Sequence, residues 1–214
     1  MDKQNRTQQT ENKQSEFDRS TAKERIDRID PYGFERSEDF DYDHAILTRR
    51  SIKWSKLLKG NNKVIKKKYK RYVRKGIPNV HRSLIWMAAS GAQAQLEQNP
   101  GYYRKLLEGE RDPRLEDTIK TDMHRTFPDN VHFRKNAEPC LQHTLFNVLL
   151  AYGHHNTNVG YCQGMNFIVG YLILIKKDEE KSFWLLDALL GRILPGRFTV
   201  ITISLPLCNF RTVH

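Results

Sequence analysis

Two short polar segments, about forty positions apart, contain the side chains of this chain that are best suited to chemistry. The first, 119–128, reads Ile-Lys-Thr-Asp-Met-His-Arg-Thr-Phe-Pro and places Arg125 three positions after Asp122. The second, 160–166, reads Gly-Tyr-Cys-Gln-Gly-Met-Asn and contains Gln163. Neither segment holds a nucleophile with its base or a full set of metal ligands. Arginine and glutamine are the side chains that GTP hydrolysis uses, one to neutralise transition-state charge and one to orient the attacking water. The pair predicts a protein that lends residues to a GTPase and has no substrate pocket of its own.

Upstream residues extend this pattern. The chain reads Gly-Ile-Pro at 76–78, and Arg82 and Trp86 follow. Together with the two polar segments, these features occur in the order found in the TBC domain of Rab GTPase-activating proteins, which the chain resembles over roughly 28–195. The resemblance implies an all-α fold, a Rab-family small GTPase as partner, and a role in intracellular trafficking. It also implies a GTPase activator that acts in trans, and not an enzyme with its own substrate.

The resemblance assigns Arg125 as an arginine finger, whose planar cation can bridge oxygens of the β- and γ-phosphates. Asp122 would then fix the approach of the arginine. The alternative is that Asp122 and Arg125, three positions apart, form only a local ion pair on a helix. For an isolated Asp-x-x-Arg this is the more common arrangement. The neighbouring Ile119, the Phe-Pro pair that follows, and the downstream glutamine segment favour the finger.

By the same resemblance, Gln163 is a second finger that replaces the water-orienting glutamine of the Rab itself. The alternative for this residue is a buried amide that satisfies backbone groups at a helix start. Tyr161 and Gly164 are expected to support Gln163: the tyrosine ring packs, and the glycine lets the backbone approach closely.

Two further motif residues are expected to be structural. Arg82 and Trp86 are four apart and share one helix face. Trp86 is expected in the core because its ring buries a large area. Arg82 is expected to pair internally. Neither is predicted to be catalytic.

No metal site is predicted. The adjacent His154 and His155 point in different directions, and Cys162 has no spaced partner that would complete a set of ligands. The resemblance implies no cofactor of the chain's own, because GTP and Mg²⁺ are bound by the partner GTPase.

The formal net charge of +11 is concentrated in one part of the chain. Residues 46–82 contain 14 Lys or Arg and no acid, whereas 1–45 contain 8 bases and 12 acids. The run at 63–75 is, in the simplest interpretation, a solvated helix face. In a Rab regulator it also favours an anionic membrane surface, where each basic residue contributes about 1 kcal/mol. Nucleic acid is not the expected partner, because no known nucleic-acid module surrounds Tyr69 and Tyr72.

The cellular setting follows from what the sequence lacks. Its longest apolar stretch, 167–175, is shorter than the roughly 20 residues that cross a bilayer. The N-terminus is polar and has no signal-peptide pattern. Three cysteines form no paired framework, which favours a reducing compartment. We expect a cytoplasmic protein that associates peripherally with endomembranes.

The pattern along the chain predicts helices separated by Gly, Pro and Asn breaks. The expected helices cover 46–58, 64–73, a stretch from 79, 102–107, 118–125, 140–152, 163–175 and a stretch from 178. The predicted organisation is a disordered segment 1–27, an extension 28–75 with basic helices, a partial TBC domain 76–195 and a divergent tail 196–214.

The tail is β-branched and strand-like, whereas the family would continue with helices. The chain is therefore expected to supply the N-terminal half of a TBC domain, followed by an irregular tail. We expect Phe183, Trp184 and Leu186 to lack partners and the chain to be a poor activator. Two alternatives stay open: a Rab-binding or membrane-associated protein that does not accelerate hydrolysis, and a basic nucleic-acid binder.

Overall fold

The computed structural model describes residues 29–36, 44–59 and 70–194. Within these ranges the regular secondary structure is helical, and the β-type pairings are two isolated bridges, Ile29 with Glu35 and Phe34 with Asn130. The predicted all-α fold is confirmed.

Some of the predicted segments lie outside the described residues. These are the disordered segment 1–27, the tail 196–214 and most of the helix predicted over 64–73. From residue 70 the chain is described, and 70–74 form a short helix. The proposed domain boundaries stay predictions.

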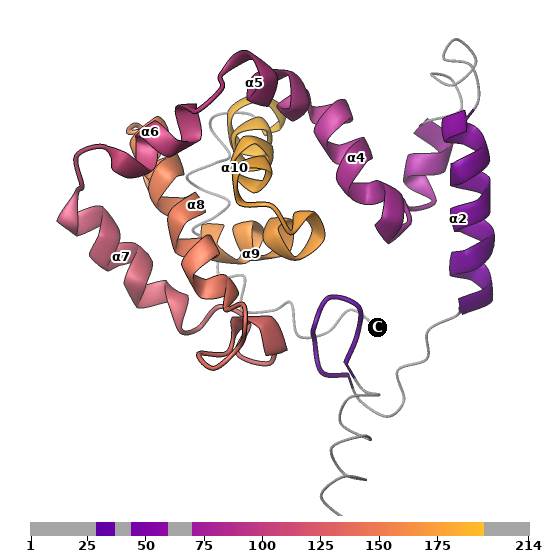
Figure 1. Cartoon of the computed structure of the whole chain (residues 1–214), viewed down its shortest axis with the longest axis horizontal. Helices are drawn as coiled ribbons and strands as arrows, with labels where there is room; N and C mark the ends of the chain where they lie inside the picture. Colours follow the sequence, from indigo (N-terminus) through magenta and orange to yellow (C-terminus); the bar gives the residue numbers. More distant parts are fainter. Residues whose placement is uncertain (1–28, 37–43, 60–69, 195–214) are drawn as a thin grey trace, which may run out of the picture.

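Figure 1 shows α2 at one side of the molecule beside α4, and α7 at the opposite side. The helices are α2 (His44–Lys59), α4 (Asn79–Ser90), α5 (Ala92–Gln98), α6 (Tyr102–Glu108), α7 (Pro113–Met123), α8 (Leu141–His155), α9 (Met165–Lys176) and α10 (Glu179–Asp187), with the 3₁₀-helix η1 (Val131–Phe133) and the π-helix η2 (Ala188–Ile193). Helix α8 contacts α6, α7, α9 and α10, so it forms the centre of the larger helical group.

Helix α7 differs from the predicted helix 118–125 at both ends. It begins at Pro113 because Asp112 caps it: the carboxylate accepts from the backbone N–H of Arg114 at 2.9 Å. It ends at Met123, before Arg125. The helix cannot continue because Phe127 has a left-handed φ of 49° and Pro128 disfavours helical geometry in the residue before it. Arg125 therefore lies in a turn and not on the helix.

Helix α9 begins two residues later than predicted. Gly164 is its N-cap and has a φ of 98°, a left-handed conformation that glycine adopts without strain. Gln163 consequently belongs to the turn before the helix. The next helix starts as the charge pattern predicted, since the Asp178 carboxylate accepts from the backbone N–H of Lys181 at 3.0 Å.

The main core lies between α7, α8, α9 and α10. Its fully buried members include Ile119, Leu145, Val148, Leu149, Tyr152, Met165, Val169, Phe183 and Leu186. The expectation that Phe183, Trp184 and Leu186 lack partners was wrong. Their exposed fractions are 0, 2 and 0%, because α10 packs against α5, α8 and α9.

An apolar groove with a volume of about 470 Å³ lies on another face of the molecule. It is lined by Trp86, Ala89, Ser90, Ile168, Tyr171, Leu172, Leu185, Leu189 and Ile193.

A second, smaller core joins α2 to α4. Trp54, Ile77 and Ile85 are its buried members. Trp86 is half-buried and packs against both cores, so it connects the two groups of helices. This agrees with its predicted packing role, although the ring is not fully enclosed. No helix in the described part of the chain is both long enough and apolar enough to span a membrane.

Candidate functional site

Asp122 and Arg125 form an ion pair across the end of α7. The Asp122 Oδ1 contacts the Arg125 Nη2 directly. Asp122 stands on the last turn of the helix with a side chain that is 7% exposed, while the guanidinium of Arg125 in the following turn is 43% exposed. A buried carboxylate thus holds an arginine that faces solvent.

Gln163 lies against the same guanidinium. Because a guanidinium can only donate hydrogen bonds, the carboxamide oxygen is the atom that faces it. This oxygen accepts from Arg125 Nη2 at 2.6 Å and from Nη1 at 3.2 Å. Gln163 is itself exposed. The two side chains that the sequence singled out, thirty-eight positions apart in the numbering, are therefore adjacent at the surface.

Tyr161 connects the two segments below the surface. Its hydroxyl donates to the Asp122 Oδ2 at 2.5 Å, so each carboxylate oxygen of Asp122 has a partner, Arg125 on one and Tyr161 on the other. Burial and this hydrogen bond raise the pKa of Tyr161 well above its ordinary value. The hydroxyl stays protonated and remains a donor to the carboxylate over the physiological pH range.

A buried asparagine completes the support. Asn166, on the first turn of α9, has no exposed surface. Its Nδ2 donates to Thr126 Oγ1 at 2.8 Å, and its Oδ1 accepts from the backbone N–H of Gly164 at 3.1 Å. Thr126 in turn donates to the backbone oxygen of Asp122 at 2.8 Å. Asn166 therefore fixes the turn that carries Arg125 relative to the turn that carries Gln163.

Sequence reasoning did not assign roles to Thr126 and Asn166. One signal was available for Asn166: it is a polar residue at the start of a strongly apolar helix, and a buried polar group needs partners. For Thr126 the sequence carried no comparable signal, since its hydroxyl acquires a function only through the fold.

Phe127 anchors the arginine turn to the core. It is 8% exposed and holds a φ of 49°, which is a strained conformation for an aromatic residue and costs about 1–3 kcal/mol. Its ring contacts Phe167 and Tyr171 of α9, with centroids 5.5 and 4.7 Å apart. A Cβ atom on Gly170 would lie 2.5 Å from the Phe127 ring, so glycine is required there. The strain is offset by close packing two residues from Arg125.

The aromatic turn at 29–36 packs against this region from the other side. The Phe34 and Phe127 rings meet edge to face at 5.2 Å, and Asn130 Nδ2 donates to the Tyr32 backbone oxygen at 2.9 Å. Asp30 organises the turn by accepting from the backbone N–H groups of Tyr32 and Phe34 at 2.9 and 3.0 Å.

Arg82 and Trp86 both stand on α4. Arg82 donates to the Ile77 backbone oxygen from Nε at 3.2 Å and from Nη2 at 2.9 Å, and it contacts the Tyr32 hydroxyl. It therefore pairs internally, as predicted. Its contacts hold the start of α4 to the aromatic turn.

The cysteine in the glutamine segment is not suited to nucleophilic chemistry. Burial raises the pKa of the Cys162 thiol, so the reactive thiolate is disfavoured. Among residues 29–36, 44–59 and 70–194, no three His, Cys, Asp or Glu side chains gather as a metal site would require. What the site offers is an exposed cation and an exposed carboxamide, called here the Arg125–Gln163 site, on a buried network formed by Asp122, Thr126, Tyr161, Gly164 and Asn166.

The fold and the site can be compared with known proteins. The family model of the Rab-GTPase-TBC domain matches residues 79–202, more than half of the chain. The chain therefore belongs to the Rab-GTPase-TBC domain family.

Its relatives agree with this assignment. The chain is 57% identical over 216 residues to growth hormone-regulated TBC protein 1-A of Danio rerio, covering 96% of the chain and 61% of the relative. It is 64% identical over 190 residues to growth hormone-regulated TBC protein 1 of Homo sapiens, covering 85% and 56%. The chain thus spans somewhat more than half the length of these relatives. The solved RabGAP TBC domain of Chlamydomonas flagella superposes with a TM-score of 0.66 at 32% identity, covering 78% of this chain and 59% of that one.

Proposed function

We propose that this chain accelerates GTP hydrolysis by a Rab-family small GTPase, and that Arg125 and Gln163 are the residues it supplies in trans. The observation that carries the proposal is the contact between the Arg125 guanidinium and the Gln163 carboxamide, both of them exposed, on buried supports. Family membership and the similarity to a RabGAP TBC domain support the same conclusion.

The division of labour follows from side-chain chemistry. The recorded contacts of Arg125 engage three of the five N–H donors of a guanidinium, so two remain for phosphate oxygens. A cation placed at the γ-phosphate stabilises the charge that builds up during transfer. The carboxamide of Gln163 has both a donor and an acceptor, which is what orienting an attacking water requires.

The remaining site residues act through these two. Asp122 keeps the guanidinium in one direction and is itself fixed by the Tyr161 hydroxyl. Gly164 allows the turn from which Gln163 projects. Because such a preformed arrangement needs little reorganisation when the partner binds, it favours the transition state. The chain forms no covalent intermediate, and GTP and Mg²⁺ belong to the GTPase.

The location we propose is the cytoplasm, with peripheral attachment to endomembranes through the basic run 63–75. Rab substrates would be met at that surface, and anionic lipid attracts such a run by about 1 kcal/mol per basic residue. Of this run, 70–75 lie within the described residues, and Arg71, Arg74 and Lys75 are exposed there.

Single-turnover GTP hydrolysis by a panel of GTP-loaded Rab proteins tests the proposal. The wild-type chain should accelerate hydrolysis by at least one Rab, and the double variant Arg125→Ala with Gln163→Ala should not. Equal binding of wild type and double variant, with no acceleration by either, would instead identify a Rab-binding protein without activator function. Acceleration that survives the double substitution would overturn the assignment of the two residues.

A further inference from the structure

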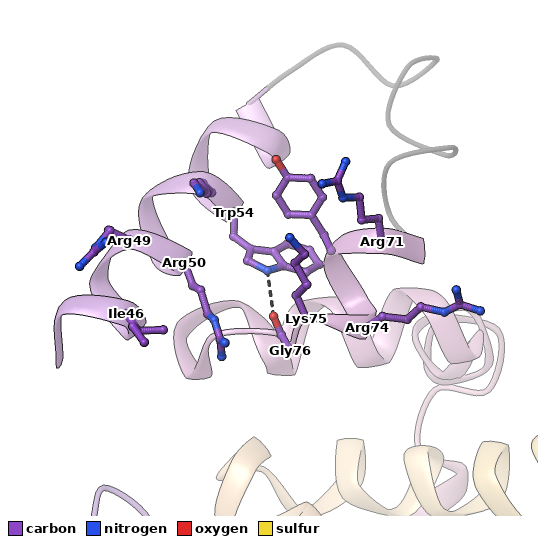
Figure 2. A pocket seen from close by; sticks show the side chains of 10 residues that line it. Ile46, Arg49, Arg50, Trp54, Arg71, Arg74, Lys75 and Gly76 are labelled. Atoms are coloured by element: carbon purple, nitrogen blue, oxygen red, sulfur yellow. Dashed lines mark hydrogen bonds between the residues drawn. The ribbon is translucent and has the colours of Figure 1, made fainter. Parts of the chain in front are cut away.

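A cavity far from the Arg125–Gln163 site in sequence lies between α2 and the segment 70–76 (Figure 2). Its volume is about 810 Å³, within the roughly 300–1,000 Å³ range of sites that hold small ligands. We call it the cationic pocket, because six of the ten residues that line it are basic: Arg49, Arg50, Lys53, Arg71, Arg74 and Lys75.

The basic side chains of the cationic pocket come from two walls. Arg49, Arg50 and Lys53 stand on α2, and the other three follow residue 70. In Figure 2, Lys75 lies beside the Trp54 ring, and Arg49 and Arg74 extend outward on opposite sides. All six side chains are exposed. Within the described ranges none of the six forms an ion pair, and the sequence from 46 to 82 contains no acid to supply one.

A rigid base holds the two walls together. The Trp54 Nε1 donates to the Gly76 backbone oxygen at 3.1 Å, a bond drawn in Figure 2. The Trp54 and Tyr72 rings meet edge to face, with centroids 5.8 Å apart. Trp54 is 2% exposed, so it is a structural residue beneath the basic side chains of the pocket. Like charges gathered in this way repel one another, and an anion that bridges them would remove the repulsion.

We propose that the cationic pocket binds a multiply phosphorylated small group of the inositol phosphate class, presented as the headgroup of an anionic membrane lipid. Four arginines on two walls suit phosphate oxygens, because each guanidinium can donate two parallel hydrogen bonds to one phosphate. A ligand with several phosphates on one ring can engage both walls at once, whereas a singly charged headgroup can reach only one.

The same geometry argues against a nucleic acid. Sites for single-stranded nucleic acid place exposed aromatic rings on which bases stack. Here Trp54 is buried, and the Tyr72 ring packs on it and is only half-exposed. The described residues of the pocket therefore provide charge without an open stacking surface.

This inference rests on the membrane attachment proposed above and makes it specific, since it adds α2 residues outside 63–75 and a defined headgroup. It does not depend on GTPase activation. Hydrolysis measured without vesicles should be unchanged when the pocket is altered, and vesicle binding should be unchanged by Arg125→Ala. A failure of either proposal therefore leaves the other one testable.

The test compares two double variants of the full chain with equal loss of charge. The pocket variant is Arg50→Gln with Lys75→Gln, one residue from each wall. The control is Lys56→Gln with Lys59→Gln, two α2 lysines that do not line the pocket. Circular dichroism should show the same helix content in both, because all four substituted side chains are exposed and such substitutions rarely disturb a fold.

Binding is measured to phosphatidylcholine vesicles that contain phosphatidylinositol bisphosphate, and to phosphatidylserine vesicles of equal surface charge. On the bisphosphate vesicles the pocket variant should bind at least about tenfold more weakly than the control variant, although the two have lost equal charge. On the phosphatidylserine vesicles the two variants should be equal.

Free inositol trisphosphate identifies the source of the phosphates. Competition with the vesicles supports a lipid headgroup, and binding of the free compound without any vesicle binding supports a soluble inositol phosphate in the same pocket. Equal losses in the two variants on bisphosphate vesicles would overturn the proposal in favour of diffuse attraction. Absence of binding to every probe, or tighter binding of duplex DNA that the pocket variant abolishes, would overturn it too.

Discussion

The Arg125–Gln163 site and the cationic pocket both present exposed arginines, but their supports differ. Arg125 is held by a buried carboxylate and by a carboxamide, and behind these stands a network in which Asn166 is wholly enclosed. The pocket arginines have no ion pairs among the described residues and share only an aromatic base. The difference separates two uses of the same side chain. A paired arginine is fixed in direction and suits catalysis, whereas unpaired arginines produce a field that attracts anions.

The comparison predicts that single substitutions in the Arg125–Gln163 site strongly lower the rate of stimulated hydrolysis. Each single substitution in the cationic pocket should instead lower anion binding by a smaller step. The largest effect should come from Arg125→Ala, which removes the cation that we propose stabilises the transition state. Stimulated single-turnover hydrolysis should fall by about 10³–10⁵-fold with Rab binding largely retained. Arg125→Lys should fail as well, since an ammonium lacks the bidentate fork.

Arg114→Ala provides the matched control, because Arg114 is exposed on α7 and forms no recorded ion pair there. Its rate should equal that of wild type. If Arg125→Ala kept more than about a tenth of the stimulated rate, the finger role would be excluded, because the expected loss is at least about a hundred times larger.

Gln163→Ala should have the next largest effect. If Gln163 orients the attacking water as proposed, its loss misplaces the nucleophile, and a misplacement of about 1 Å costs about 10²-fold. Single-turnover hydrolysis measures this loss. A Rab that lacks its own switch glutamine should remain a partial substrate of the wild-type chain. If the Rab glutamine proves indispensable and Gln163 does not, Gln163 is only a structural residue beside Arg125.

The sequence located the two exposed members of the site but not their geometry. Arg125 and Gln163 could be found because their types and flanking residues match a family pattern. The end of α7 and the start of α9 were each predicted wrongly by two residues. The strained Phe127 determines where α7 ends, and the capping Gly164 determines where α9 begins. Periodicity does not register a single residue with a left-handed φ.

The buried support and the pocket were harder to predict for a common reason. Asn166 and Thr126 meet through the packing of α9 on α7, which joins residues 40 positions apart. Likewise, the charge count identified the basic residues of 46–82, including those of α2, but not that α2 and 70–76 form two walls of one pocket. Which helices lie side by side is a tertiary property, and no local pattern encodes it.

Tyr161→Phe tests the buried support of Arg125, and its expected effect is of intermediate size. The variant removes the hydrogen bond to Asp122 and keeps the ring. A hydrogen bond to a charged group is worth about 1.5–3 kcal/mol, so stimulated hydrolysis should fall by at least about tenfold and the free energy of unfolding should decrease by a similar energy. Tyr171→Phe is the control, since that hydroxyl is exposed and has no recorded partner.

The same variant should also differ from wild type in how its stability depends on pH in alkaline solution. The raised pKa of Tyr161 means that above about pH 10 the unfolded chain loses this proton while the folded chain keeps it. Stability from this group is therefore full below about pH 10 and declines as pH rises, by up to about 1.4 kcal/mol per pH unit. Urea unfolding between about pH 10 and 11 should show a shallower decline for Tyr161→Phe than for wild type. Parallel declines would mean that Tyr161 titrates normally in the fold.

The smallest effect should come from Trp54→Phe, which weakens the base of the cationic pocket. The substitution removes the indole N–H that donates to the Gly76 oxygen at 3.1 Å, and a neutral hydrogen bond contributes about 0.5–1.5 kcal/mol. Hydrogen exchange should accelerate in α2 and 70–78 and stay unchanged in α7, α8 and α9, because Trp54 belongs to the smaller core. Stimulated hydrolysis without vesicles should not change. Trp184→Phe is the matched control, since it removes a buried indole N–H that has no hydrogen-bond partner in the main core. Faster exchange around α7 in Trp54→Phe, or a loss of hydrolysis, would show that the two regions are energetically coupled and that the contrast between them does not hold.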